Sequence, residues 1–117
     1  MLIKMLKSKL HRVTVTETKL HYPGSIAIDS ELMDAADILP YETVMVADLN
    51  NGNRLETYAI PADAGSGQIT VLGAAAHLIN PKDIIIIFSF TYCTPEQAKE
   101  IKPKIIVPDE NNKIKDS

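Results

Sequence analysis

A serine that directly follows a glycine is the first feature of this sequence that could take part in chemistry. Ser25 comes after Pro23 and Gly24, and its hydroxyl is a nucleophile of a kind that many enzymes use. The chain shows no Ser/His/Asp spacing that would activate this hydroxyl as in conventional nucleophilic catalysis. Taken alone, a Gly-Ser pair after proline is more often a plain turn, so its meaning depends on the residues that accompany it.

The other residues with metal-binding or redox potential form no supporting pattern. His11, His21 and His77 lack a metal-ligand spacing such as His-x-x-x-His, so we expect no metal site. The single cysteine, Cys93, cannot form an internal disulfide, which suits a reducing cytoplasm. We expect Cys93 to be a small core or rim residue rather than a nucleophile.

Five short blocks occur in one order, and together they carry a resemblance. They are KLHR at residues 9–12, YPGSIAID at 22–29, NGNR at 51–54, TYAI at 57–60 and GAAAH at 73–77. In this order and spacing they closely resemble the bacterial aspartate 1-decarboxylase family, from residue 1 to about residue 90. Five blocks in register are far more specific than any one of them, and the likeness fades towards the C-terminus.

The resemblance implies a precursor that cuts itself between Gly24 and Ser25. The products would be a β chain of residues 1–24 and an α chain of residues 25–117. The Ser25 hydroxyl would attack the Gly24 carbonyl and form an ester, which β-elimination then breaks. The resulting dehydroalanine would lose ammonia on hydrolysis and leave a pyruvoyl group. Serine suits this because it combines a nucleophilic oxygen, an α-hydrogen and a β leaving group, while glycine has no Cβ to block the approach.

The activity implied by the resemblance is decarboxylation of L-aspartate to β-alanine and carbon dioxide, which would feed pantothenate and coenzyme A synthesis. The covalently bound pyruvoyl group from Ser25 would take the place of pyridoxal phosphate. The substrate amine would form a Schiff base with its ketone, and the conjugated amide carbonyl would accept electrons as carbon dioxide leaves. A homotetramer of processed protomers is implied as well. Any need for a maturation helper stays open.

The resemblance also assigns roles to three residues of the segment 54–58. Tyr58 matches the proton donor of the family, and a phenol keeps its proton at neutral pH. Thr57 matches a donor that holds the Gly24 carbonyl for cleavage and then contacts the substrate. Arg54 matches the residue whose planar guanidinium binds a substrate carboxylate. Without the matched register, these would be interpreted as an ordinary strand aromatic, a β-branched strand residue and a solvated charge.

Four further positions complete the substrate site that the resemblance implies: Lys9, Gly73, Ala74 and Ala75. The Lys9 charge would suit a dianionic substrate, and backbone N–H groups at the start of a helical turn would suit a carboxylate. Leu72 departs from the pattern, because the family commonly has Asn at this position. The missing amide puts in doubt how Thr57 and the substrate are oriented, and would slow self-cleavage.

The elements that must position these residues are mostly strands. We expect strands at residues 9–16, 43–49, 54–60, 68–72, 84–90 and 104–107, with a short extended piece at 26–28. Asn51 and Gly52 tolerate the positive φ angles of a tight turn, so the strands at 43–49 and 54–60 should form a hairpin. The continuous apolar run of residues 84–90 predicts a strand that is buried on both faces.

Short helices are expected between the strands. Asp29 or Ser30 can cap a helix whose apolar stripe includes positions 32, 35, 36 and 39, and Pro40 would end it. Residues 73–77 predict one helical turn, and Thr94 opens a capping box for a helix that runs to about residue 101. The polar end at residues 109–117 is expected to be loose. The resemblance implies that these elements form a six-stranded double-psi β-barrel, mainly β with small helices, in one domain of residues 1–117.

Composition limits the alternatives. The chain has 45% hydrophobic and 23% charged residues, which is ordinary for a soluble globular protein. A formal net charge of -3 argues against a nucleic-acid partner. The longest apolar run, residues 84–88, is too short to span a bilayer, and the start lacks a signal peptide, so we expect no membrane partner and a cytoplasmic location.

Two alternatives to aspartate decarboxylation stay open at this point. A small β-barrel oligomer could bind a ligand and do no chemistry. The pyruvoyl chemistry could also act on a longer acid such as glutamate, because a pocket discriminates one methylene only modestly.

Overall fold

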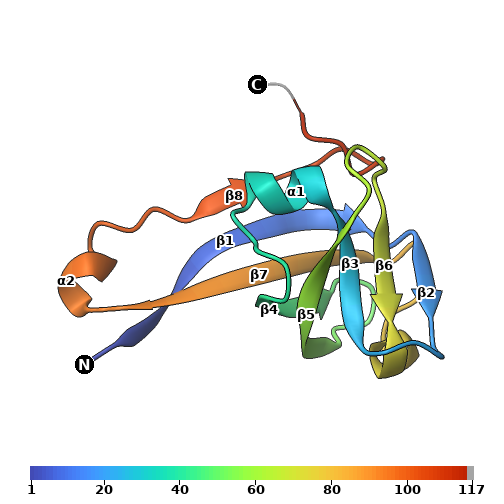
Figure 1. Cartoon of the computed structure of the whole chain (residues 1–117), viewed down its shortest axis with the longest axis horizontal. Coiled ribbons are helices and arrows are strands. Elements are labelled where there is room, and N and C mark those ends of the chain that lie inside the picture. Colours follow the sequence, from blue (N-terminus) through green and yellow to red (C-terminus); the bar gives the residue numbers. More distant parts are fainter. Residues whose placement is uncertain (116–117) are drawn as a thin grey trace.

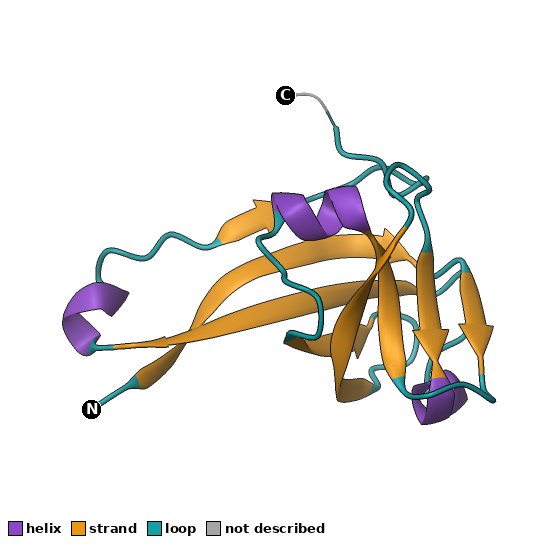
Figure 2. Cartoon of the chain, viewed as in Figure 1, coloured by secondary structure: helices purple, strands orange, loops and turns teal. Residues whose placement is uncertain are grey.

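The computed structural model describes residues 1–115, and these form a mainly β domain (Figure 1). Its strands are β1 (Ile3–Thr14), β2 (Glu17–Lys19), β3 (Ser25–Asp29), β4 (Thr43–Asp48), β5 (Arg54–Ala62), β6 (Ile69–Leu72), β7 (Ile84–Cys93) and β8 (Lys104–Ile106). Its helices are short: α1 (Ser30–Ala35), the 3-10 helix η1 (Gly73–His77) and α2 (Pro95–Ala98) (Figure 2). The predicted mainly β class with small helices is confirmed.

The strands form one hydrogen-bonded order, β2-β6-β3-β5-β4-β7-β1-β8. Six strands therefore lie between two edge strands, β2 and β8, each of three residues. Among residues 1–115 no pairing joins these two edges, so the sheet is compatible with a small barrel but is not closed by hydrogen bonds. Parallel pairing of β3 with β5 and antiparallel pairing of β3 with β6 place the start of β3 beside the end of β6 (Figure 1).

The core consists almost entirely of aliphatic side chains. Its fully buried members include Leu10, Ile26, Ile28, Leu32, Ile69, Ile79, Ile85 and Ile87. Strand β7 alternates, with Ile85 and Ile87 buried while Ile84 and Ile86 are only half-buried. The prediction that this strand is buried on both faces is therefore wrong. Only one face of β7 is covered by the core, and the other face is half-open.

Helix α1 begins as predicted and ends earlier. Its N-cap is Asp29, whose carboxylate accepts hydrogen bonds from the N–H groups of Glu31, Gly65 and Gly67 at 2.8–3.0 Å. Burial would raise the pKa of Asp29, but these three donors outweigh that effect and lower it. Through this one carboxylate, the segment after β3 is tied to the loop that precedes β6.

The predicted continuation of α1 to residue 39 is wrong. Asp37 has a φ of 54°, a left-handed conformation that ends the helical path. The chain then turns so that Ile38 is 3% exposed, while Leu39 is 68% exposed. Ile38 thus takes the core position that the helical spacing had assigned to its neighbour.

Two predictions from local sequence, the loop at Gly52 and the capping box at Thr94, are confirmed. Gly52 has a φ of 79° in the loop between β4 and β5, whose register pairs Ala47 with Arg54. Thr94 caps α2 with a complete capping box, although the helix ends at Ala98 rather than near residue 101.

The C-terminal segment is held in place at residues 109–113, contrary to the prediction of a loose end. Asn112 is 1% exposed and accepts a hydrogen bond from the Thr14 N–H at 2.8 Å. Its amide also donates to the carbonyls of Thr14 and Gly67, both at 2.8 Å. Residues 116–117 lie outside the described residues.

Within residues 1–115 no helix is long and apolar enough to cross a membrane.

Two buried carboxyl groups meet where the β4–β5 loop contacts the turn before β7. Asp48 is 2% exposed and lies beside Asp83, which is 8% exposed. Burial raises the pKa of Asp48 from 3.8 to about 6, and the neighbouring Asp83 carboxyl adds to the rise. The folded protein therefore binds a proton here that the unfolded chain releases at a lower pH.

This pair predicts a pH-dependent gain in stability for Asp48→Asn. Because the native pKa of Asp48 is raised, its proton stabilises the fold below pH ~4, and this contribution is lost as the pH rises through about 6. At pH 8 the amide should raise the free energy of unfolding by about 1–3 kcal/mol, because it donates a hydrogen bond to Asp83 without a charge. The gain should vanish near pH 4 in urea unfolding. The exposed Asp34→Asn is the control, and equal curves for the two variants would contradict the shared proton.

Candidate functional site

The segment Gly24–Ser25 lies against the first residue of η1. Gly73 has a φ of 81°, and a Cβ added to it would lie 2.7 Å from the Gly24 Cα and 2.9 Å from the Gly24 nitrogen. The Tyr22 carbonyl oxygen would also be 2.9 Å away. Such distances are too short for any side chain, so glycine at position 73 permits a direct contact between two stretches of backbone.

Ser25 and Gly24 differ in exposure. Ser25 begins β3 and is 3% exposed, whereas Gly24 lies just before the strand and is exposed. Across the β3–β6 ladder the partner of Ser25 is Leu72. The predicted departure from the family pattern therefore lies directly opposite the serine. Leu72 is also the N-cap of η1 and makes no side-chain capping hydrogen bond.

A cavity of about 440 Å³ opens beside Gly24. Its volume is in the range of ~300–1,000 Å³ that is usual for small-molecule sites. Five of its lining residues were predicted from the sequence: Gly24, Thr57, Tyr58, Ala74 and Ala75. The cavity lies between β5 on one side and η1 on the other. The structure thus brings together Gly24, the Thr57–Tyr58 pair and the first turn of η1.

Four other residues complete the lining: Leu55, Glu56, Leu72 and Leu78. Sequence reasoning noted Leu72 only as a departure and missed the rest as site residues. Leu55 and Glu56 lie between Arg54 and Thr57, and this adjacency was the available signal. Leu78 follows η1 directly, and its position could be found only from the way the helical turn packs against β5.

Arg54 and Lys9 do not line this cavity. Arg54 is exposed at the start of β5, and its Nη1 lies 3.8 Å from the Met45 sulfur. Lys9 lies on β1, with its Nζ 6.0 Å from the centre of the Phe88 ring. In the strand order β1 is three strands from β5, which corresponds to about 14 Å at the usual strand spacing.

Both residues belong to the half-open face of the sheet, which we call the outer face. Direct cross-strand partners share a face, and the registers give one row from Lys9 through Phe88 and Met45 to Glu56. A second row runs from His11 through Ile86 and Ala47 to Arg54. Tyr58 is four residues from Arg54 on β5 and lies on the same face, as the alternation predicted.

His11 on the outer face has an unsatisfied nitrogen. Its Nδ1 is buried and has no hydrogen-bond partner among the described residues. Burial lowers the pKa of His11, and the charges of Lys9 and Arg12 lower it further. The imidazole is therefore neutral at physiological pH, beside a lysine that carries a charge.

A second cavity of about 290 Å³ shares Glu56 with the first and is otherwise lined by residues that include Lys4, Glu42, Phe90 and Tyr92. None of the predicted site residues lines it. Cys93 is 6% exposed, which confirms that it is a small, mostly buried residue. Within the described part of the chain, no three His, Cys, Asp or Glu side chains are grouped as metal ligands would be.

Comparison with known proteins shows the family of this chain. Residues 1–115 match the family model described as aspartate decarboxylase. The chain belongs to the aspartate decarboxylase family. The match covers every described residue, including Gly24 and Ser25, the cavity and the outer face. Members of this family are enzymes, and this chain is one of them.

Three relatives, each named aspartate 1-decarboxylase, show how close the likeness is. The protein of Moorella thermoacetica is 58% identical over 110 residues, which cover 94% of this chain and 86% of the relative. That of Acetivibrio thermocellus is 54% identical over 114 residues, covering 97% of this chain and 90% of the relative. That of Porphyromonas gingivalis is 53% identical over 115 residues, covering 97% and 98%.

The contact between Gly73 and Gly24 can be tested with a matched pair of substitutions. Gly73 and Gly52 have φ angles of 81° and 79°, but only Gly73 has atoms within 4 Å of an added Cβ. Gly52→Ala should cost about 1 kcal/mol, because alanine is strained at positive φ. Gly73→Ala should cost about 2–4 kcal/mol, because its Cβ also overlaps backbone that cannot move away. Urea unfolding gives both values, and equal costs would argue against the contact.

Proposed function

We propose that this enzyme decarboxylates L-aspartate to β-alanine and carbon dioxide with a pyruvoyl group that it makes from its own Ser25. The observation that carries the proposal is the cavity beside Gly24, lined by Thr57, Tyr58 and the start of η1. Membership of the aspartate decarboxylase family and the names of the three relatives support the substrate. The β-alanine would feed pantothenate and coenzyme A synthesis in the cytoplasm.

The first reaction is cleavage of the precursor between Gly24 and Ser25. The Ser25 hydroxyl attacks the Gly24 carbonyl carbon, the C–N bond breaks, and an ester joins the two parts. Loss of the Ser25 α-proton then expels the Gly24 carboxylate and leaves dehydroalanine, which water hydrolyses to a keto group with release of ammonia. An amide is a poor electrophile, so a donor must stabilise the oxyanion, and the proposed donor is Thr57 on the cavity wall.

The residues present fit a small keto group at position 25. Ser25 is almost completely buried, and Gly24 leads directly into a cavity large enough for a small substrate. The Gly73–Gly24 contact fixes the backbone at this point without a side chain between them. Such a group supplies an electron-accepting carbonyl that the twenty standard side chains do not offer. In the proposed reaction neither pyridoxal phosphate nor a metal takes part.

The chain's own residues bind the substrate and move the proton. Tyr58 carries a phenolic proton at the cavity wall and is the proposed donor to the carbon that loses carbon dioxide. The N–H groups of Gly73, Ala74 and Ala75 in the first turn of η1 have no partner within the helix and can receive a carboxylate. Thr57 contacts the substrate after it has served in cleavage.

Lys9 and Arg54 would contribute to the substrate site when copies of this chain assemble. Both lie on the outer face, whose apolar members include Met45, Ala47, Ile84, Ile86, Phe88 and Phe90. A sheet face with this many half-buried apolar side chains is stabilised when another surface covers it. We propose that it packs against other copies in a homotetramer, so that Arg54 and Lys9 face substrate carboxylates at a site that copies share. Arg54 binds through its guanidinium fork, and Lys9 through charge.

Self-cleavage predicts a mass signature. Purified protein should give two fragments, residues 1–24 and 25–117, with the larger one lighter by the mass of ammonia than a chain that begins with serine. The serine oxygen leaves with the Gly24 carboxylate and water supplies the keto oxygen, so ammonia is the only net loss. Ser25→Ala should stay intact and lose decarboxylation completely, since alanine has no nucleophilic oxygen. Ser66→Ala, in an exposed turn, is the matched control and should cleave normally.

The same measurement separates the proposal from its rival, a barrel that binds a ligand without chemistry. An intact chain with an ordinary serine, after prolonged warm incubation of wild-type protein, would favour the rival. Decarboxylation of aspartate by Ser25→Ala would contradict the pyruvoyl mechanism itself. Parallel assays with glutamate measure how well the cavity discriminates the extra methylene.

The outer face predicts how assembly responds to a charge. Phe88→Asp replaces an apolar ring in the middle of this face with a carboxylate and should convert the tetramer to smaller species in analytical ultracentrifugation, because covering the face would then remove apolar contact and desolvate a charge. Leu39→Asp changes an exposed apolar residue outside this face and should leave the tetramer intact. A Phe88→Asp tetramer of normal stability would show that assembly uses another surface.

A further inference from the structure

The segment 36–42, between α1 and β4, lies against β5 at Tyr58. The Tyr41 N–H donates to the Ala59 carbonyl at 2.7 Å, and the Ala59 N–H donates to the Glu42 carbonyl at 2.9 Å. The regular β4–β5 ladder has Thr43 and Tyr58 as its last pair. Tyr41 and Glu42 therefore continue the pairing by one step and hold the residue directly after Tyr58.

The ring of Tyr41 contacts the ring of Tyr58. Their centroids are 6.1 Å apart and the planes are inclined by 35°, within the range of ~4.5–7 Å that favours aromatic pairs. Tyr41 has a φ of 70°, which is uncommon for a bulky residue, and it is 75% exposed. Core packing does not account for a large ring held in this way, because most of its surface faces solvent.

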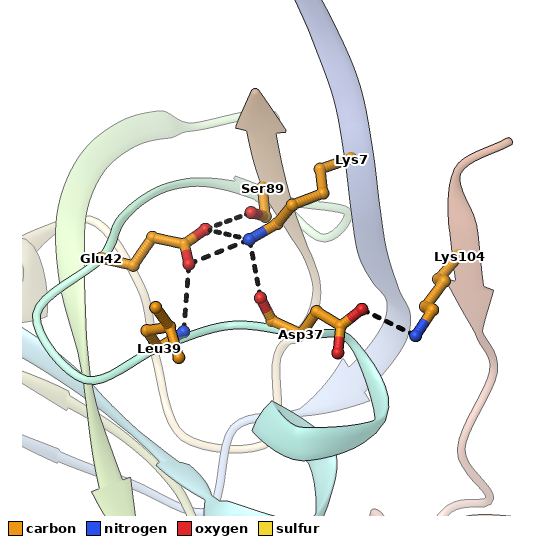
Figure 3. A network of polar contacts seen from close by, with 6 residues as sticks. All are labelled: Lys7, Asp37, Leu39, Glu42, Ser89 and Lys104. Carbon is orange, nitrogen blue, oxygen red and sulfur yellow. Dashed lines mark hydrogen bonds and ion pairs between the residues drawn. The ribbon is translucent and has the colours of Figure 1, made fainter. Parts of the chain in front are cut away.

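Glu42 anchors the segment (Figure 3). Its carboxylate accepts hydrogen bonds from the Leu39 N–H at 3.0 Å and from the Lys7 Nζ at 2.9 and 3.0 Å. It also accepts a hydrogen bond from the Ser89 hydroxyl. One side chain thus ties the segment to itself, to β1 and to β7.

Lys7 strengthens this anchor from β1. The β1–β7 register shifts between Leu6 and Ser8, and the extra residue at this irregularity is Lys7. Its Nζ also donates to the Asp37 carbonyl at 2.6 Å, so it binds the segment at both ends (Figure 3). Burial would raise the pKa of Glu42, but the N–H of Leu39 and the side chains of Ser89 and Lys7 outweigh it and lower the pKa. The anchor is therefore charged at neutral pH.

We propose that Tyr41 and Glu42 are positioning residues for Tyr58, with Glu42 holding the segment in place and the Tyr41 ring limiting the orientations of the Tyr58 phenol. The inference rests on the proposed function, in which Tyr58 delivers a proton to the reacting carbon. A proton donor must be within hydrogen-bond reach, and a small displacement of a reacting group is costly in rate. Neither residue lines the cavity beside Gly24, so both act through Tyr58.

The ring contact is tested with two variants of Tyr41. Tyr41→Asn removes the ring and keeps a residue that tolerates positive φ, whereas Tyr41→Phe keeps the ring. Tyr41→Asn should cleave normally by mass and lower kcat about ten-fold, with a much smaller change in KM, because substrate contacts are unaltered. Tyr41→Phe should keep at least half of the wild-type kcat. An equal loss in both variants, or a full kcat in Tyr41→Asn, overturns the proposal.

A double-mutant cycle tests whether Glu42 acts through Tyr41. Glu42→Gln should lower kcat in the same direction, and the double variant with Tyr41→Asn should be no slower than the slower single variant. Independent effects would multiply, and that result overturns the shared action. Lys104→Gln is the control, because it removes the exposed ion pair with Asp37 at 2.7 Å and should leave kcat unchanged. Assays well below the Tm of each variant separate positioning from loss of folded protein.

Tyr58→Phe separates failure of this inference from failure of the proposed function. The variant should cleave normally and lose most turnover. If it does so while Tyr41→Asn keeps full turnover, Tyr58 remains the proposed proton donor and the positioning role of Tyr41 is wrong. If Tyr58→Phe keeps full turnover, the donor assignment fails, and the positioning role fails with it.

Discussion

The backbone contact between Gly73 and Gly24 is the constraint on which the site depends. It needs a residue without Cβ at position 73, and it needs β3 and β6 to be neighbours in the right register. That register pairs Ser25 with Leu72, so η1 begins directly opposite the start of β3. A shift by one residue would move the Ser25 side chain to the opposite face of the sheet and would move η1 off Gly24.

The register of β3 and β6 is secured from outside the site by Asp29 and Asn112. Asp29 lies at the other end of β3 and binds the N–H groups of Gly65 and Gly67, just before β6. Asn112 binds the carbonyl of Gly67 and also the backbone of Thr14 at the end of β1. A polar side chain that satisfies several buried backbone groups fixes their relative position, because leaving any of them unpaired is costly. The C-terminal segment is thus part of the framework that aligns Gly24 and Ser25.

Local chemistry explains which parts of the fold could be predicted from the sequence. The turn at Gly52, the cap at Asp29 and the capping box at Thr94 depend on neighbouring residues only, and each was predicted correctly. The end of α1 could not be predicted in this way. It depends on whether Ile38 or Leu39 reaches the core, and tertiary packing decides that. The first half of β1 was missed because its order comes from pairing with β7, which is remote in sequence.

In the site, too, some features could be predicted from the sequence and others depend on how distant parts of the chain pack. Five matched blocks led to the residues that meet at the cavity, because a family pattern already contains the result of long-range packing. The alternation on β5 placed Arg54 and Tyr58 on one face, yet it could not show that Tyr58 and the intervening Glu56 line the cavity while Arg54 does not. Lys9 and Arg54 lie instead among apolar side chains of the outer face. If another surface covers this face, it must supply opposite charge or a polar ligand to Lys9 and Arg54, since covering a charge without a partner is unfavourable. Their position apart from the cavity supports the proposal that one chain forms only part of the substrate site, in which packing of the outer face and binding of a dianion would support each other.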